Sequence, residues 1–140
     1  MMTRREADTL MAELGKVWGF KAGLDADGRA SYAVETASIS FFYQPSTEDL
    51  ECRALVYRFR AEPRPGLVEG YAAEEQAGTD CGGGHVEYQP SNKGLFLLRA
   101  YQEAPQVTVF SAELTKLMKA SLKWVDEVVP RVAQHVLHPQ

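Results

Sequence analysis

The apolar residues between Thr3 and Trp18 recur every three or four positions, which is the period of a helix with one buried face. Thr3 and Glu6 have the spacing of a capping box, in which each side chain satisfies the backbone N–H of the other residue. Gly15 and Gly19 are expected to weaken and end the last turn. The pattern therefore predicts a first helix over residues 3–17.

The next segment alternates between apolar and polar side chains, which is typical of strands with one buried face. The sequence Asp-Ala-Asp-Gly over residues 25–28 predicts a turn before a first strand over residues 30–35. The alternation is clearest over residues 38–44, where Phe42 is the exception to it. The buried face of this second strand is expected to carry Ile39, Phe41 and Tyr43.

A third strand is predicted over residues 50–60, where the apolar positions switch from even to odd midway. Such a switch indicates either a β-bulge or burial of both faces of the strand. The sequence Glu-Pro-Arg-Pro-Gly over residues 62–66 should interrupt the sheet, because proline cannot donate to a strand ladder.

The middle of the chain predicts a short helix followed by a hairpin. Leu67 to Gln76 has the apolar residues of a second helix, and a glycine-rich loop over residues 78–84 follows it. The hairpin has a polar turn over residues 89–94. Its second strand, residues 95–100, is apolar on both faces.

A last helix is predicted from the apolar residues that recur between Leu114 and Val136, with Ser111 as its cap. Pro130 is expected to kink or end this helix near Val129. The order of elements is therefore α-β-β-β-α-β-β-α. Strands that follow one another between helices favour an α+β fold, with a mostly antiparallel sheet packed against the helices. We expect one domain that spans residues 1–140.

The composition, 45% hydrophobic and 24% charged in 140 residues, is that of a globular domain large enough to bury a core. No run approaches the roughly 18 apolar residues of a membrane span, and the amino terminus lacks the apolar segment of a signal peptide. We therefore expect a cytoplasmic protein without a membrane partner. A net charge of −4 with no basic stripe argues against nucleic acid as a partner.

The familiar catalytic and metal-binding motifs fail on the spacing of their residues. An EF-hand loop that began at Asp25 would lack the required glycine and the final acid. The glycines at 82–84 are not followed by the Lys-Ser/Thr of a P-loop. The histidines lack the spacing of zinc ligands, and Cys52 and Cys81 are expected to be free thiols. We expect no metal, no cofactor and no catalysis.

Aromatic residues gather in the second and third predicted strands and at the end of the first helix. Most of them are expected in the core. Phe41 and Phe42 are adjacent, however, so they point to opposite faces of a strand. Helices on one face of the sheet would leave the other face partly apolar, and such a surface is usually an interaction site. Either a second subunit or a peptide would cover it.

Three blocks of the sequence carry a resemblance to a known family. Residues 14–28 read Leu-Gly-Lys-Val-Trp-Gly-Phe and then Leu-Asp-Ala-Asp-Gly, and residues 83–99 hold Gly-Gly-His-Val-Glu-Tyr and then Gly-Leu-Phe-Leu-Leu-Arg. Residues 117–129, which include Trp124, form the third block. With the order of elements, these blocks resemble the type III secretion chaperones of the Tir-chaperone (CesT-like) class, over about residues 5–130.

The resemblance implies an ATP-independent chaperone, a homodimer around which a segment of a secreted effector protein wraps in extended form. Apolar patches of the first helix and the sheet would hold this segment, and strand pairing would add to the affinity. The expected partner-binding residues are Leu14, Trp18, Phe20, Phe41, Tyr43, Tyr57 and Phe59. The expected dimer interface, on the second helix and a neighbouring strand, consists of Leu67, Val68, Tyr71, Val86 and Tyr88.

Two features depart from the family. The second helix is weakly apolar and rich in glutamate, and the third strand carries Arg53, Arg58 and Arg60, which would add polar contacts. The residues alone also leave open a small-molecule-binding or enzymatic α+β domain with a pocket lined by the aromatic residues. A third hypothesis is an assembly adaptor of another secretion or regulatory system, with the same fold and the same dimer.

Overall fold

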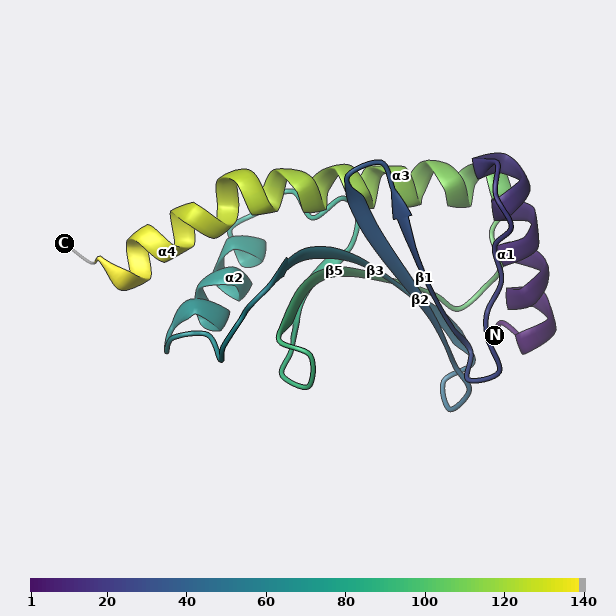
Figure 1. The fold of residues 1–140 in the computed structure, drawn as a ribbon, viewed down its shortest axis with the longest axis horizontal. Helices are drawn as coiled ribbons and strands as arrows, with labels where there is room; N and C mark the ends of the chain where they lie inside the picture. The colour runs from purple at the N-terminus through teal and green to yellow at the C-terminus, as the bar shows by residue number, and fades with distance from the viewer. Residues whose placement is uncertain (139–140) are drawn as a thin grey trace.

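The strands of the chain form one antiparallel sheet in the order β1-β2-β3-β5-β4. A computed structural model describes residues 1–138 (Figure 1). The strands are β1 (Arg29–Val34), β2 (Ala37–Gln44), β3 (Asp49–Arg58), β4 (His85–Gln89) and β5 (Gly94–Tyr101). The helices are α1 (Arg4–Trp18), α2 (Leu67–Gln76), α3 (Val107–Lys123), the π-helical turn η1 (Trp124–Val128) and α4 (Val129–Leu137). The predicted α+β fold and its order of elements are confirmed.

The helices lie on one side of the sheet, and the sheet arches so that its concave face turns away from them (Figure 1). The segments α3, η1 and α4 run as one long rod along the sheet, with α1 packed at one end and α2 at the other. We call the face toward the rod the inner face and the concave face the outer face. Among the described residues, no helix is long and apolar enough to cross a membrane.

The first helix begins and ends as its sequence predicts. The hydroxyl of Thr3 accepts a hydrogen bond from the backbone N–H of Glu6, and the Glu6 carboxylate accepts one from the N–H of Thr3. Gly19 closes the helix in the left-handed conformation, at a φ of 85°. Gly15 lies where the chain turns back on the helix, because a Cβ there would be 2.5 Å from the carbonyl oxygen of Phe20.

The inner face of the sheet and the apolar faces of the helices form the core. Of the two explanations for the switch of apolar positions in the third strand, the structure shows the bulge, because the register of β3 on β5 shifts between Leu55 and Tyr57. Side chains from the three central strands that are buried in this core are Ile39, Phe41, Tyr43, Leu50, Cys52, Ala54, Val56, Leu95, Leu97 and Tyr101.

The outer face carries apolar side chains, as predicted, but arginine side chains lie over two of its aromatic rings. The Phe42 ring lies beneath the guanidinium of Arg29, with 4.2 Å from its central carbon to the ring centroid. Phe96 is only 5% exposed although no described helix covers it, and the guanidinium of Arg58 lies over its ring. Arginine side chains thus cover part of the apolar surface that the alternation pattern leaves outside.

The expected start of the last helix at Ser111 is wrong. Helix α3 begins a full turn earlier, after Gln106, which makes no side-chain capping bond. Ser111 lies inside the helix, and its hydroxyl accepts a hydrogen bond of 3.0 Å from the indole Nε1 of Trp18. This serine therefore joins α1 to α3 instead of capping a helix.

Pro130 interrupts the regular hydrogen bonding of the last helix, as predicted, but the helix does not end there. The turn before it, η1, is π-helical, and α4 continues beyond the proline to Leu137. Proline has no N–H to donate, and a π-helical turn is one way for a helix to accommodate this gap. The rod bends at this turn, which brings α4 against α2 (Figure 1).

The loop between α2 and β4 is fixed to the rod at two points. The indole Nε1 of Trp124 donates a hydrogen bond of 2.9 Å to the backbone oxygen of Asp80. Gly82, at a φ of +64°, packs directly on α3, because a Cβ at this position would lie 2.7 Å from the oxygen of Lys116. The glycine-rich segment is thus a close-packed connection and not a free loop.

Candidate functional site

The edge of the sheet at β1 is open. Val34 pairs with Ala37 across a tight turn, so Val34 directs its backbone N–H and C=O toward β2. Because the direction alternates along a strand, Tyr32 and Ala30 do the same. The N–H and C=O groups of Ser31 and Ala33 therefore point away from the sheet. No hydrogen bond within residues 1–138 engages them. Two residues of this edge can thus pair with a further strand.

The other edge of the sheet, at β4, is partly closed by α2. The carboxylate of Glu75 accepts a hydrogen bond of 2.6 Å from the backbone N–H of Val86, and its second oxygen lies 3.1 Å from Nδ1 of His85. A side chain of the protein itself therefore occupies the position where an added strand would pair. The two edges are not equivalent, and β1 is the more open of the two for strand addition.

A shallow apolar hollow lies beside the open edge, and we call it the hairpin groove. It has a volume of about 290 Å³ and lies between the end of α1, the β1–β2 hairpin and α3. Its lining residues are Trp18, Val34, Glu35, Ala37, Thr115, Met118, Lys119 and Leu122. The groove is apolar at its base, with one acid and two polar or basic side chains at its rim.

The partner-binding residues predicted near the first helix lie at different depths. Leu14, Phe41 and Tyr43 are buried in the core, where the Tyr43 hydroxyl donates a hydrogen bond to the backbone oxygen of Met2. Trp18 and Phe20 are half-buried, and Trp18 lines the hairpin groove. Aromatic contacts run without interruption from the groove into the core, through Trp18, Phe20, Tyr32, Phe41 and Phe110.

The remaining predicted residues meet at the other end of the sheet. Phe59 packs against the rings of Tyr57, Tyr71 and Tyr88, at centroid distances of 4.9, 6.4 and 6.0 Å. Tyr57 is 41% exposed, whereas Tyr71 is 1% exposed, and burial raises the pKa of its hydroxyl to about 12. We call these four residues the α2 aromatic cluster. Two residues expected to touch an effector and two expected to form the dimer thus lie in one cluster.

The other residues of the expected dimer interface surround this cluster. Leu67, the first residue of α2, is buried, and Val86 on β4 is half-buried. Val68 is 36% exposed on the outside of α2. The most exposed side chains in this region are therefore Val68 and Tyr57, while Phe59, Val86 and Tyr88 are half-buried. The buried Leu67 and Tyr71 can only shape the surface above them.

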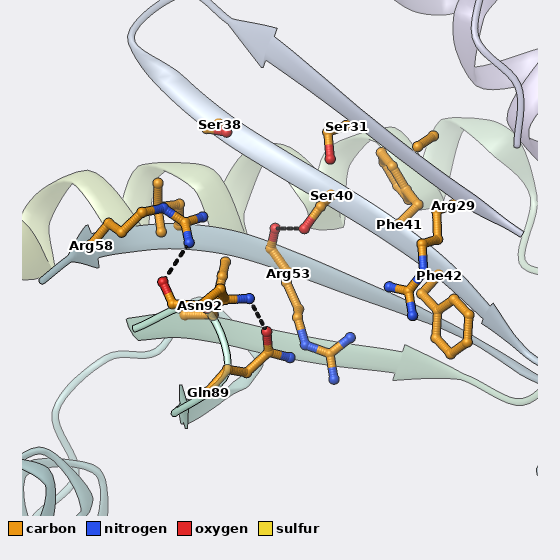
Figure 2. A pocket seen from close by; sticks show the side chains of 13 residues that line it. Arg29, Ser31, Ser38, Ser40, Phe41, Phe42, Arg53, Arg58, Gln89 and Asn92 are labelled. Atoms are coloured by element: carbon orange, nitrogen blue, oxygen red, sulfur yellow. Dashed lines mark hydrogen bonds between the residues drawn. The ribbon is translucent and has the colours of Figure 1, made fainter. Parts of the chain in front are cut away.

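A second hollow, on the outer face of the sheet, has a different chemistry (Figure 2). It has a volume of about 240 Å³, and we call it the arginine furrow. Figure 2 shows Arg29 and Arg58 at its two ends, with Arg53 and the serines between them. Its lining residues from the sheet and the β4–β5 turn are Arg29, Ala30, Ser31, Ser38, Ser40, Phe41, Phe42, Arg53, Leu55, Arg58, Gln89, Asn92 and Phe96.

The three arginines of the furrow differ in their partners. Arg53 forms ion pairs with Glu51 at 2.9 Å and with Glu87 at 2.7 Å. Burial by itself would lower the pKa of Arg53, and the hydrogen bonds to the two carboxylates outweigh this effect and raise it. Arg58 donates to the backbone oxygen of Asn92 at 2.8 Å, and neither Arg58 nor Arg29 forms an ion pair within residues 1–138.

Sequence reasoning named Arg53 and Arg58 as sources of polar contacts but missed Arg29 and the groove residues on α3. Arg29 reaches the furrow only because β1 pairs with β2 in a register that sets it opposite Phe42. The alternating serines of β2, Ser38 and Ser40, were the available signal, since they mark a polar strip on the same face. Met118 and Leu122 fit the helical repeat of apolar residues. This repeat shows which face of the helix is apolar, but not whether a residue on that face lies in the core or lines a groove.

Other chemistry is not assembled in the described part of the chain. Cys52 and Cys81 are free thiols, as predicted, and both of them are buried. Burial raises the pKa of both thiols, to about 11 for Cys81, so neither is an activated nucleophile. Among residues 1–138, no three histidine, cysteine or acidic side chains are grouped so that they could hold a metal ion.

Comparison with known proteins places this arrangement among solved structures. Neither a family model nor a curated protein matches the sequence. A chain of the ExsC–ExsE complex is similar with a TM-score of 0.72 and 17% identity, over 91% of this chain and 96% of that one. A chain of the HopA1–SchA chaperone–effector complex is similar with a TM-score of 0.67 and 13% identity, over 88% of this chain and 95% of that one. These similarities confirm the predicted α+β fold, which this chain shares with both neighbours.

Proposed function

We propose that the protein is a cytoplasmic, ATP-independent chaperone that binds an extended segment of a secreted effector protein as a homodimer. The similarity of its fold to chains from the ExsC–ExsE and HopA1–SchA complexes, the second a chaperone–effector complex, supports this proposal. A single observation in the chain itself carries it: the open edge of β1 runs beside the apolar hairpin groove.

The open edge and the groove complement one another as a binding site for an extended chain. A partner strand that pairs with Ser31 and Ala33 would form main-chain hydrogen bonds without regard to its sequence. An apolar side chain of that partner would then fill the hairpin groove between Trp18 and Met118. Main-chain pairing supplies affinity, and the groove selects for an apolar anchor. Neither interaction requires a nucleotide, because both depend on binding free energy alone.

If the effector pairs with the open edge of β1, replacing Ala33 by proline should raise the dissociation constant of the effector about tenfold. Proline removes the outward N–H of Ala33, and its ring blocks the approach of a partner strand. The pairing of β1 with β2 should survive, because this N–H does not take part in it. The measurement is the dissociation constant for the effector recovered with this chain by pull-down from its native cells.

Ala33→Ser is the matched control, since serine keeps the backbone N–H at the same exposed position. Thermal unfolding of both variants should lie close to that of the unchanged protein. Equal binding by Ala33→Pro and Ala33→Ser would show that strand addition at β1 is not the mode of capture.

The homodimer is proposed to form through the α2 aromatic cluster and Val68. Replacing Val68 by glutamate should raise the dimer dissociation constant by at least about tenfold, because it places a charge in an apolar contact. Sedimentation velocity over a range of protein concentrations measures this effect. Val109→Glu is the control, because Val109 is similarly exposed but lies at the start of α3. A protein that is monomeric at every concentration, or that dimerises equally well with Val68→Glu, contradicts this interface.

A further inference from the structure

The arginine furrow is not accounted for by strand addition at β1, since it lies on the outer face of the sheet (Figure 2). Its long axis follows β3. Arg29 on β1 pairs with Phe42 on β2, and Phe42 pairs with Glu51 on β3, so Arg29 and Glu51 lie at the same height in the sheet. Arg58 lies seven residues beyond Glu51 along β3. The bulge between Leu55 and Tyr57 takes up one of these residues, so at about 3.3 Å per residue the two arginines are anchored roughly 20 Å apart along the strand.

The charges in the furrow alternate along this axis. At the centre, the ion pairs of Arg53 with Glu51 and Glu87 bring one positive and two negative charges together. At each end, a guanidinium has no carboxylate partner within residues 1–138 and lies over an aromatic ring. The furrow is therefore positive at both ends and not positive in the middle. Guanidinium groups with free N–H donors bind carboxylates and phosphates through paired hydrogen bonds.

This pattern distinguishes among the possible anions. A single phosphate or carboxylate cannot contact two arginines anchored so far apart. Nucleic acid requires a continuous positive stripe, whereas here two carboxylates lie beside the central arginine. An extended polypeptide spans about 20 Å with six or seven residues, so it can offer one carboxylate to each end. Between the ends, the hydroxyls of Ser31 and Ser38 face the furrow and are available to a polar backbone.

We propose that the arginine furrow binds an extended polypeptide segment that carries two acidic residues about six positions apart. This inference rests on the proposed function, since it specifies the chemistry of a second part of the bound effector. The segment at β1 is selected for an apolar anchor, and the segment in the furrow is selected for the spacing of its acids. Specificity for one effector then arises from two different signals.

The test uses three synthetic peptides of equal length made of serine, threonine and glycine. The first carries two glutamates separated by about six residues, the second carries the two glutamates side by side, and the third carries glutamines at the spaced positions. Binding to the full chain is followed by NMR titration at low salt, where charge pairs are least screened. We expect the spaced peptide to bind about fivefold more tightly than the adjacent one and about tenfold more tightly than the glutamine peptide.

The variants Arg29→Gln and Arg58→Gln should each remove the advantage of the spaced peptide. Both side chains are exposed, so these changes should leave the fold intact. Arg5→Gln, on the exposed face of α1, is the matched control and should keep that advantage. Equal binding of the spaced and adjacent peptides would overturn the inference, as would an equal loss in Arg5→Gln. Saturation by inorganic phosphate with no preference among the peptides would also overturn it, in favour of a small-anion site.

Failure here is separable from failure of the proposed function. If the peptides show no preference but Ala33→Pro still weakens effector capture, the furrow inference is wrong and the chaperone proposal stands. If the spaced peptide binds as expected but Ala33→Pro and Ala33→Ser capture the effector equally well, the strand-addition mode is wrong and the furrow remains.

Discussion

Replacing Trp124 by alanine is expected to lower the free energy of unfolding by about 4 kcal/mol. The side chain is 1% exposed and is among the largest that are fully buried in the chain. Its removal leaves a cavity beneath η1, and it also removes the hydrogen bond to the backbone oxygen of Asp80. Domains of this kind are stable by about 5–15 kcal/mol, so the variant would lose a large part of its stability.

Urea unfolding followed by far-UV circular dichroism measures this loss, since the variant also loses an indole fluorophore. Trp124→Phe is the informative companion, because phenylalanine fills most of the volume but cannot donate to Asp80. We expect it to lose about 1–2 kcal/mol. A change of less than about 1 kcal/mol in Trp124→Ala would mean that the rod and the sheet do not depend on this contact.

Replacing Gly82 by alanine is expected to destabilise the fold by about 3 kcal/mol. The backbone at Gly82 has a φ of +64°, which a side chain disfavours, and the new Cβ would lie 2.7 Å from the oxygen of Lys116 and 2.8 Å from Cα of Leu117. Both contacts are with the backbone of α3, so no rotation of a side chain relieves them.

Gly78→Ala is the control that separates the two causes. Gly78 also has a positive φ, of +96°, but a Cβ there meets nothing within 4 Å. It should therefore lose only the conformational part, about 1 kcal/mol. Urea unfolding of the two variants gives the difference directly. If they are equally destabilised, the loop does not pack on α3 as described.

Much of the fold follows from local signals in the sequence. The capping box at Thr3 and Glu6, the alternation in β2 and the parity switch in β3 each report the geometry of a few neighbouring residues. Such signals do not depend on the rest of the chain. The order of elements, and from it the α+β class, could therefore be predicted with no knowledge of distant contacts.

The errors lie where a distant contact decides the outcome. Ser111 is a good capping residue, but the hydroxyl accepts from Trp18, 93 positions away, and α3 begins earlier. The resemblance placed Leu14, Phe41 and Tyr43 among the partner-binding residues, whereas the structure buries all three in the core. Contact of these three residues with a partner stays a prediction. The same prediction for Trp18 and Tyr57 has better support, because both have solvent-exposed surface.

The outer face shows the same dependence on register. Arg29 and Arg58 lie 29 positions apart in sequence and on two strands that do not touch. Only the pairing of β2 with both β1 and β3 brings them to one furrow. An alternating sequence tells which face a residue takes, but it does not tell which residues of other strands lie beside it.

The hydrogen bond between the carboxylate of Glu75 on α2 and the edge strand β4 has a consequence for assembly. A sheet with two free edges can recruit copy after copy, the first strand of one molecule aligning with the last strand of the next, and such head-to-tail growth yields open fibres. Because Glu75 occupies the amide of Val86, it hinders the pairing of a further strand at this edge. Head-to-tail growth of copies through their sheets is therefore disfavoured.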